Sequence, residues 1–294
     1  MPRNTLLVLK DIGSFLTPVL HSHGWINLAP AERIEDGFRY SLLIDRSCPV
    51  SIEVISRSGD IRCYADKALD PRQAYKLRKI LSRMLSLDFP VGEFCDTCER
   101  QKKEDYLSLA IKGWGRMLRC PTAWEDAVKT LCTTNASWSY TKSMCKSICS
   151  EFGETTPSGR KTFPHPDEIS GKSPRLLFKI ARMGYRTGSL IELSRKALSS
   201  SSWLLTGEYP SESALYKEIN SWTGFGKYAT DHLMILLGFY GYLPVDREVA
   251  LHLGVRNQGN RSFSGVSKFK EWGKFRFVAY KLERIAKKRN WIGD

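Results

Sequence analysis

The sequence predicts an α+β fold that is mostly α, with a small N-terminal α+β domain built on an antiparallel sheet over residues 1–104 and an all-helical domain over residues 105–294. Apolar and polar residues alternate through residues 50–65, which is the pattern of half-buried strands. From about Pro121 onward, apolar residues instead recur at the spacing of helices. The polar stretch at residues 96–105 lies between these patterns, and we expect it to be a loop or a domain boundary.

Two local signals organise the first domain. Residues 50–54 and 61–65 alternate in hydrophobicity on either side of Ser58 and Gly59, a typical turn pair, so we expect a β-hairpin there. Asp70 followed by Pro71 is typical of a helix start, because the carboxylate can cap free backbone N–H groups and proline suits the first helical position. Apolar residues at helical spacing follow this pair and predict a helix.

Start and stop signals also divide the second domain into helices. Thr122 and Glu125 have the spacing of a capping box and predict a helix start. Gly153 is a typical end for the helix after it, and residues 163–166, which contain two prolines, are expected to form a rigid connector. Further helices are expected at residues 173–183, 187–199, 213–222, 227–237 and 269–288.

The charge balance favours a polyanionic partner. The chain carries a formal net charge of +14, which indicates nucleic acid before a membrane surface, although a solubilising surface charge remains the alternative. The longest apolar stretch, residues 232–245, is interrupted by glycines and too short to cross a bilayer. No signal peptide is evident at the start of the chain, so we expect an intracellular protein without a membrane partner.

The cysteines do not indicate a metal site. All eight lie between Cys48 and Cys149, and one pair, Cys95 and Cys98, forms a C-x-x-C sequence. A structural zinc site normally needs a second such pair or a matching histidine pair. We therefore expect free, buried thiols and no bound metal, while the role of Cys95 and Cys98 stays open.

The segment at residues 213–249 carries the most specific motif. Two apolar helices are joined by the run Thr223, Gly224, Phe225, Gly226 and Lys227. A G-x-G turn can expose backbone N–H groups at the start of the second helix, where the helix dipole also favours a phosphate and Lys227 adds positive charge. An ordinary helical hairpin is the alternative, and a dinucleotide site is disfavoured because a helix precedes the glycines.

A carboxylate follows this hairpin at a suggestive place. Asp246 lies twenty residues after Gly226, just beyond Pro244, and Arg247 comes next. If the hairpin holds a backbone phosphate, Asp246 lies near the neighbouring sugar, where an anion can stabilise an oxocarbenium-like transition state. The structural alternative is that Asp246 only caps a helix.

Gly224, Gly226, Pro244, Val245 and Asp246 together resemble, in order and spacing, the helix-hairpin-helix (HhH-GPD) DNA glycosylase superfamily. This resemblance implies that Asp246 is the catalytic carboxylate and that the residues from Thr223 to Lys227 together with Arg247 contact DNA. It also implies an all-helical glycosylase domain, and it allows a monovalent cation at the hairpin, with no other cofactor.

Weaker similarities surround this motif. Residues 132–135 resemble the helix-end segment of 8-oxoguanine DNA glycosylases. This resemblance implies that Asn135 fills the gap that a flipped nucleotide leaves in the duplex. Residues 163–164 and the turn at residues 184–186 are also similar to the family, and so is the β-rich start. Trp138 could line the base pocket and stack on DNA, and a buried core residue is the alternative.

One departure from the family concerns the nucleophile. Bifunctional relatives carry a lysine two positions after the second glycine, whereas this chain has Tyr228 there. Lys227 is one residue earlier and points roughly 100° away on a helix. The pattern resembles alkylbase (3-methyladenine) DNA glycosylases, in which the aromatic lies against the flipped base and can stack on a cationic purine. A core aromatic is the alternative for Tyr228.

The expected function is that of a monofunctional base-excision-repair glycosylase, which hydrolyses the N-glycosidic bond of a damaged purine in duplex DNA. An alkylated purine is the first choice of substrate. An 8-oxoguanine-type glycosylase and a non-catalytic DNA-binding protein are the alternatives.

Residues 268–289 hold nine Lys or Arg and two Glu, which favours DNA contact over a plain solvated helix face. We expect a monomer that works in a bacterial cytoplasm or a eukaryotic nucleus. No cysteine follows Cys149, so an iron–sulfur cluster after Asp246 is excluded.

Overall fold

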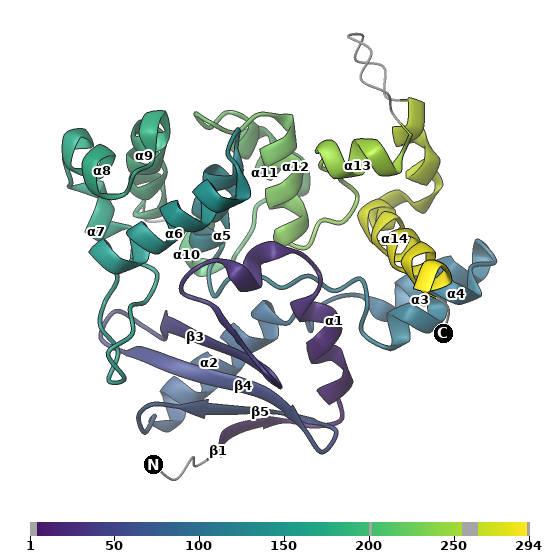
Figure 1. Cartoon of the computed structure of the whole chain (residues 1–294), viewed down its shortest axis with the longest axis horizontal. Coiled ribbons are helices and arrows are strands. Elements are labelled where there is room, and N and C mark those ends of the chain that lie inside the picture. Colours follow the sequence, from purple (N-terminus) through teal and green to yellow (C-terminus); the bar gives the residue numbers. More distant parts are fainter. Residues whose placement is uncertain (1–4, 200–201, 255–263, 293–294) are drawn as a thin grey trace.

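The computed structural model describes residues 5–199, 202–254 and 264–292, and it confirms the predicted fold class. A five-stranded antiparallel sheet forms one layer, and helices form the rest of the molecule (Figure 1). The strands follow the order β1-β5-β4-β3-β2 across the sheet. They are β1 (Thr5–Leu9), β2 (Glu32–Ile34), β3 (Gly37–Leu43), β4 (Pro49–Arg57) and β5 (Asp60–Ala65).

The predicted hairpin and helix start are both confirmed. In the hairpin of strands β4 and β5, the pair next to the turn is Arg57 and Asp60. The two turn residues between them, Ser58 and Gly59, have positive φ angles of 54° and 82°. Such a turn matches the twist of the flanking strands. Asp70 caps helix α2 (Pro71–Met84) by accepting a hydrogen bond from the amide of Gln73, whose side chain bonds back to the cap.

The loop predicted at residues 96–105 is wrong. Most of this stretch is helical, in α3 (Val91–Arg100) and α4 (Glu104–Ile111), with only a short turn between them. Phe94 and Cys98 are buried one helical turn apart, so a single apolar stripe is enough to hold the otherwise polar helix α3 on the core. The domain boundary at residue 104 stays a prediction.

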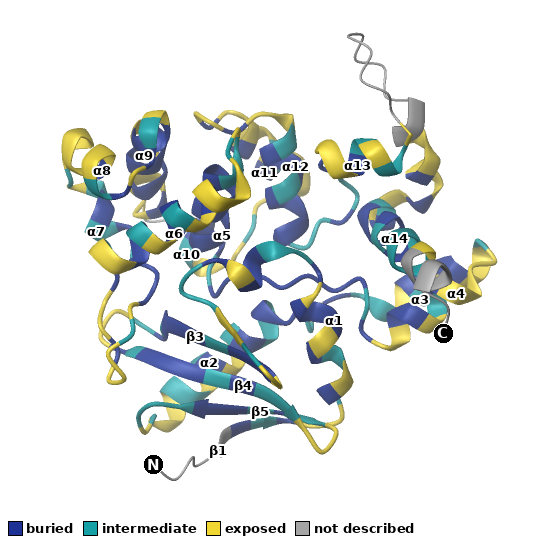
Figure 2. Cartoon of the chain, viewed as in Figure 1, coloured by how far each residue is buried: buried dark blue, intermediate teal, exposed yellow. Residues whose placement is uncertain are grey.

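The helical part of the molecule surrounds α5 (Ala123–Thr133). Thr122 caps this helix as predicted, by accepting a hydrogen bond from the amide of Glu125 at 3.2 Å. Nearly all of α5 is buried (Figure 2). The other helices are α1 (Leu16–Leu20), α6 (Trp138–Phe152), α7 (Asp167–Ser170), α8 (Pro174–Ile180), α9 (Thr187–Ala197), α10 (Trp203–Thr206), α11 (Glu212–Asn220), α12 (Lys227–Leu236), α13 (Arg247–His252) and α14 (Arg276–Ile292).

Most expected helices of this half exist with shorter bounds, but the last one begins later than predicted. The first residues of the expected helix at 269–288 belong instead to a 3₁₀ segment, Ser264–Phe275. Gly273 has a φ of 50° there and breaks the helical path, so α14 begins only at Arg276. Helix α6 ends as predicted, with Gly153 as its C-cap.

Buried charges join the helices to the sheet. Lys129 of α5 is completely buried and forms an ion pair with Glu125 at 2.9 Å, and the hydroxyl of Tyr40 on β3 donates to the same carboxylate at 2.5 Å. On the same helix, Asp126 accepts from the indole of Trp25 at 3.0 Å and from Arg83 at 2.7 Å. Because a buried charge that loses its partner is costly, these contacts fix the segment around Trp25 against α5.

No helix in the described ranges combines the length and the apolar character that crossing a membrane requires.

Candidate active site

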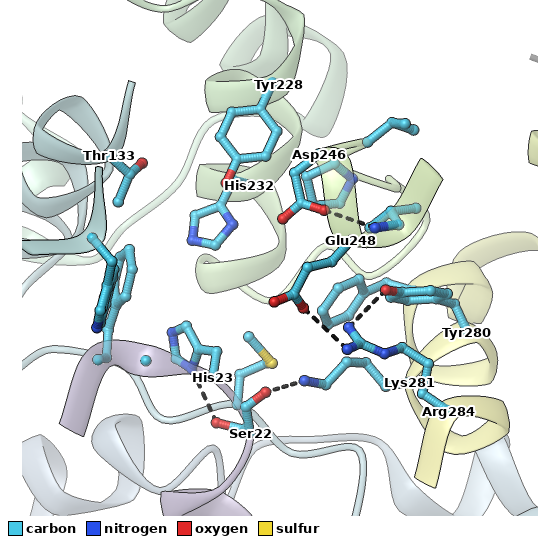
Figure 3. Close-up of a pocket in the computed structure, with 18 of the residues that line it drawn as sticks. Ser22, His23, Thr133, Tyr228, His232, Asp246, Glu248, Tyr280, Lys281 and Arg284 are labelled. Carbon is cyan, nitrogen blue, oxygen red and sulfur yellow. Dashed lines mark hydrogen bonds and ion pairs between the residues drawn. The ribbon is translucent and has the colours of Figure 1, made fainter. Parts of the chain in front are cut away.

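A cavity of about 870 Å³ lies where the N-terminal segment meets the helical part (Figure 3). Its lining comes from parts of the chain that are far apart in sequence. These parts are residues 21–25, 133–141, 228–232, 244–249 and 277–285, with Met117 between them. Asn135, Trp138, Tyr228 and Asp246, which the sequence singled out, all contribute to it. A volume of this order is typical of small-ligand sites.

Asp246 stands at the entrance to α13. Its Oδ1 accepts a hydrogen bond from the amide of Val249 at 2.8 Å, so the N-cap interpretation is confirmed. The residue is nevertheless exposed and lines the cavity beside Tyr228 (Figure 3). A carboxylate that caps with one oxygen still presents its charge to the cavity, so capping does not exclude catalysis.

Tyr228 lies in the first turn of α12 and points into the cavity (Figure 3). It is half-buried, so it belongs to the cavity wall rather than to the interior of the core. Burial raises the pKa of its phenol to about 12, and the nearby Asp246 acts in the same direction. The side chain is therefore a neutral phenol near neutral pH.

Asn135 and Trp138 follow the end of α5. Asn135 has a φ of 46° and is exposed at the turn between α5 and α6. The buried Arg186, from the turn that resembles the family, donates to the carbonyl of Thr134 and so holds this turn in place. Trp138 is 41% exposed, and its ring lies so close to Gly24 that a Cβ there would come within 2.5 Å.

The hairpin between α11 and α12 has the expected form. Gly224 has a φ of 89°, and a Cβ on it would lie 2.8 Å from Leu131, so this position requires glycine. Gly226 is the N-cap of α12 without a side-chain cap, and nothing lies within 4 Å of its Cβ position. The first amides of α12 therefore lack intrahelical partners and can receive an anion.

The side chains of this hairpin are less available to DNA than the sequence implied. The side chain of Phe225 is only 4% exposed and packs edge-on against Trp222 at 5.2 Å, so its predicted contact with DNA, which stays a prediction, would involve its backbone. The hydroxyl of Thr223 donates to Glu192 at 3.0 Å. Lys227 is exposed but pairs with Asp231 at 2.7 Å, and Arg247 is exposed in the first turn of α13.

The C-terminal basic segment is partly neutralised. Glu283 binds Lys268 at 2.6 Å and Lys287 at 3.1 Å. Burial acts to raise the pKa of this carboxyl, but these lysines and a hydrogen bond from His252 outweigh it and lower the pKa to about 2. The side chains of residues 288–289 lie outside the described ones. This segment therefore offers fewer free cations to DNA than its composition indicates.

Two cations of α14 nevertheless line the cavity. Arg284 pairs with Glu248 at 3.0 Å and donates to the hydroxyl of Tyr280 at 2.9 Å. Lys281 donates to the backbone carbonyl of Ser22 and so connects α14 to the N-terminal segment.

The sequence did not single out the histidines of the cavity. His23 lies more than two hundred residues from Asp246 in the chain, and no local pattern marks it. His232 is four residues after Tyr228 on the same helix, so its place on the same face was available as a signal.

The thiols are free, as predicted. Seven of the eight cysteines are buried, and Cys95 is half-buried. Burial raises the pKa of Cys98 to about 12, which keeps it a thiol. In the part of the chain that the structure describes, no three His, Cys, Asp or Glu side chains are grouped as metal ligands would be.

Comparison with known proteins supports the resemblance drawn from the sequence. No family model matches the chain. The 3-methyladenine DNA glycosylase from Archaeoglobus fulgidus has a similar structure, with a TM-score of 0.66, 18% identity, and coverage of 96% of this chain and 97% of that one. The apo 8-oxoguanine glycosylase/lyase of Clostridium acetobutylicum gives a TM-score of 0.63 at 16% identity and covers 94% of each chain.

A curated relative points the same way. The N-glycosylase/DNA lyase of Saccharomyces cerevisiae is 25% identical over 190 residues, which is 59% of this chain. The match spans half the length of that relative. The structural likenesses, all at low identity, establish that the chain has a DNA glycosylase fold.

Proposed function

Because the chain has the fold of the helix-hairpin-helix DNA glycosylases, we propose that it is a base-excision-repair DNA glycosylase that removes a damaged base by hydrolysis, without lyase activity. One observation carries this proposal: Asp246 and Tyr228 line the same cavity. Tyr228 lies in the first turn of α12, the helix that follows the G-x-G hairpin. Such an enzyme works on cellular DNA, so we also propose an intracellular location.

Binding would begin at the hairpin. The free amides at the start of α12, next to Gly226, suit a backbone phosphate, and the positive net charge favours duplex DNA of any sequence. A glycosidic bond inside the base stack is inaccessible, so the damaged nucleotide must rotate into the cavity. Asn135, which is exposed at its turn, would occupy the gap that this nucleotide leaves. A monovalent cation at the hairpin stays part of the proposal.

Asp246 would supply the chemistry. As the bond to the base breaks, the sugar develops positive charge, and a fixed carboxylate stabilises that charge and orients the attacking water. Tyr228 is a neutral phenol and cannot form an imine with the sugar. Lys227 is 77% exposed and held by Asp231, outside the cavity lining. These observations support a reaction that ends at an abasic site.

Two substrate classes are candidates. Tyr228 favours an alkylated purine, as the sequence implied, because a cationic ring stacks well on an electron-rich one. The second candidate, a neutral damaged base such as 8-oxoguanine, is favoured by the histidines and Lys281 in the cavity.

An excision assay tests the proposal. Duplexes with single defined lesions are incubated with the protein, and strand breaks are measured with and without alkali. We expect breaks only after alkali, and loss of these breaks in Asp246→Asn. No excision from any lesion duplex by the folded protein, under conditions where it binds DNA, would contradict an enzymatic function.

A further inference from the structure

Helix α8 and the turn after it carry positive charge that no nearby acidic residue balances. Residues 169–191 contain five Lys or Arg and no Asp or Glu. Arg175 and Lys179 are exposed on one face of α8, and the exposed Arg182 follows the end of the helix. None of these three side chains forms an ion pair with a residue that the structure describes. We call these three cations the α8 patch.

The α8 patch differs in this respect from the basic C-terminal segment. There Glu283 binds both Lys268 and Lys287, and Arg284 pairs with Glu248. The cations of the C-terminal segment are thus partly neutralised within the protein, whereas those of the α8 patch keep their charge for a partner. A polyanion is the partner that such a surface attracts.

The stability of α8 does not explain where its cations lie. Ser173 caps the helix by accepting a hydrogen bond from the amide of Leu176 at 3.3 Å, and the buried Leu177 holds it on the core. Lys179 in the last turn is favourable for the helix dipole, but Arg175 in the first turn opposes it. The position of Arg175 therefore indicates a role outside the helix.

An exposed aromatic residue accompanies the patch. Phe178 lies three residues after Arg175 on the same face of α8, and its side chain is 62% exposed (Figure 2). A single exposed apolar side chain is ordinary on a protein surface. One that lies among unpaired cations suits a partner that alternates negative and apolar groups, as the phosphates and sugars of a DNA strand do.

Direct contacts connect the patch to the hairpin proposed to bind DNA. The hydroxyl of Tyr140, in the first turn of α6 just after Asn135, donates to the backbone carbonyl of Arg182. Helix α9 begins directly after the turn at residues 184–186. The hairpin contacts this helix, because the hydroxyl of Thr223 donates to Glu192 at 3.0 Å. The α8 patch therefore continues the surface formed by the hairpin and the turn of Asn135.

The spacing of the patch suits the backbone of a duplex. Arg175 and Lys179 are one helical turn apart, about 6 Å along the axis of α8. The phosphates of each DNA strand follow one another about every 3.4 Å along the duplex axis. Two cations at this separation can therefore each meet a phosphate of the same strand, while Phe178 meets the sugars between them.

We infer that the α8 patch is a second duplex-binding surface, beyond the hairpin and the cavity, which holds DNA to one side of the flipped nucleotide through its phosphates. Phe178 packs on the sugars of the same strand. Because phosphate contacts carry no sequence information, this surface binds damaged and undamaged DNA alike. The inference rests on the proposed function, since it takes duplex DNA as the partner.

The dependence of affinity on salt tests the patch. In the triple variant Arg175→Gln, Lys179→Gln and Arg182→Gln, the slope of log affinity for undamaged duplex against log salt concentration should become shallower by about 2–3, because each lost phosphate contact accounts for about 0.9. The melting temperature should stay the same, since all three side chains are exposed.

Three cations of α2 provide a control with the same change in net charge. Arg72, Arg78 and Lys79 are exposed, and none of them forms an ion pair with a described residue. Their replacement by Gln should leave the slope within about 1 of that of the unmodified protein. Equal slopes in the two triple variants would overturn the inference and leave an acidic protein as the candidate partner of the patch.

The length of the duplex locates the contact. Duplexes are lengthened stepwise on one side of a lesion and then on the other, and affinity is measured for each. The unmodified protein should gain affinity with length further on one side than on the other, and the patch variant should lose this extra gain. The same gain in both proteins contradicts a contact to one side of the flipped nucleotide.

Phe178 separates apolar contact from charge. Phe178→Ala should weaken binding to the long duplex by about 3- to 10-fold, as expected for a partly buried aromatic side chain. The salt slope should not change, because no counterion is involved. Leu176→Ala, at a residue that is 39% exposed on another face of α8, serves as the control. An equal loss in both variants would assign the effect to the helix rather than to contact by Phe178.

Excision by the patch variant distinguishes this inference from the proposed function. Its single-turnover rate at saturating protein should stay within about 2-fold of the unmodified rate, because the cavity is unchanged. If no lesion is excised by either protein but the salt slopes differ as expected, the proposed function fails and the α8 patch stands as a DNA-binding surface. If excision proceeds and the slopes are equal, the inference alone is wrong.

Discussion

The Oδ1 atom of Asp246 accepts a hydrogen bond from the amide of Val249 at 2.8 Å and so caps the start of helix α13, and the same residue lines the cavity. One side chain thus has a structural role that depends on its oxygen atom and a proposed catalytic role that depends on its charge. Asparagine keeps the capping oxygen and removes the charge, whereas alanine removes both. The two roles can therefore be separated by two substitutions at one position.

We predict that Asp246→Asn lowers the single-turnover excision rate by about 100-fold or more, because removal of a group that stabilises charge in the transition state commonly has this effect. DNA affinity should stay the same or rise, since an anion near the phosphates is lost. Asp246→Ala should lose the same activity and also about 1 kcal/mol of stability from the missing cap. Excision by Asp246→Asn close to the unmodified rate would remove Asp246 from the chemistry.

The hairpin glycines provide a matched pair. Gly224→Ala should lower the free energy of unfolding by about 1–3 kcal/mol, because φ is 89° and the new methyl group meets Leu131. Gly226→Ala should unfold like the unmodified protein, since its Cβ position is open. Denaturant unfolding checks both.

The bulkier Gly226→Val should still fold but bind every duplex more weakly, because it obstructs the amides of α12, and phosphate contacts carry no sequence information. Affinity measured over a range of salt concentrations should fall steeply with salt. Unchanged affinity in Gly226→Val would show that the hairpin is only structural.

Local signals predicted much of the fold, because they depend on neighbouring residues. The caps at Asp70 and Thr122 and the β4–β5 turn are of this kind. The failures have physical causes as well. Helix α3 was missed because its surface is polar and only a narrow stripe is buried, and the start of α14 was misplaced because Gly273 adopts a positive φ.

The cavity was only partly predictable for a different reason. Its motif residues are close together in the sequence, whereas Trp25 and His23 reach the cavity through contacts such as the hydrogen bond from Trp25 to Asp126. Nothing near them in the sequence marks those contacts. Periodicity on α12 alone could have placed His232 beside Tyr228.

The buried histidines predict acid sensitivity. A histidine whose pKa is 6.5 when unfolded and about 4 when folded binds its proton more readily in the unfolded chain between these values. His232 therefore contributes stability above pH 6.5 that is lost as the pH falls toward 4, by an amount on the order of 1–3 kcal/mol. Urea unfolding at several pH values measures this slope. His232→Phe should reduce it, and an equal slope in that variant would contradict the assignment to His232.

The last prediction concerns the missing amine. A Schiff base requires a lysine nitrogen at the sugar, and the position that holds this lysine in bifunctional relatives is Tyr228 here. Its phenol is neutral, since its pKa is raised to about 12, and it cannot form an imine. Borohydride should therefore trap no covalent complex with lesion-bearing DNA, and strand breaks should appear only after alkali.

Two lysines make this prediction refutable in distinct ways. Lys227 is held by Asp231 at 2.7 Å but has a long, exposed side chain, and Lys281 is the lysine among the described residues that line the cavity. A trapped complex that disappears in Lys227→Ala would show that the hairpin lysine turns toward the sugar. One that disappears only in Lys281→Ala would place the nucleophile on α14, opposite to the family position. If no complex forms with the unmodified protein while excision proceeds, water is the nucleophile. Tyr228 then remains part of the wall against which the flipped base lies.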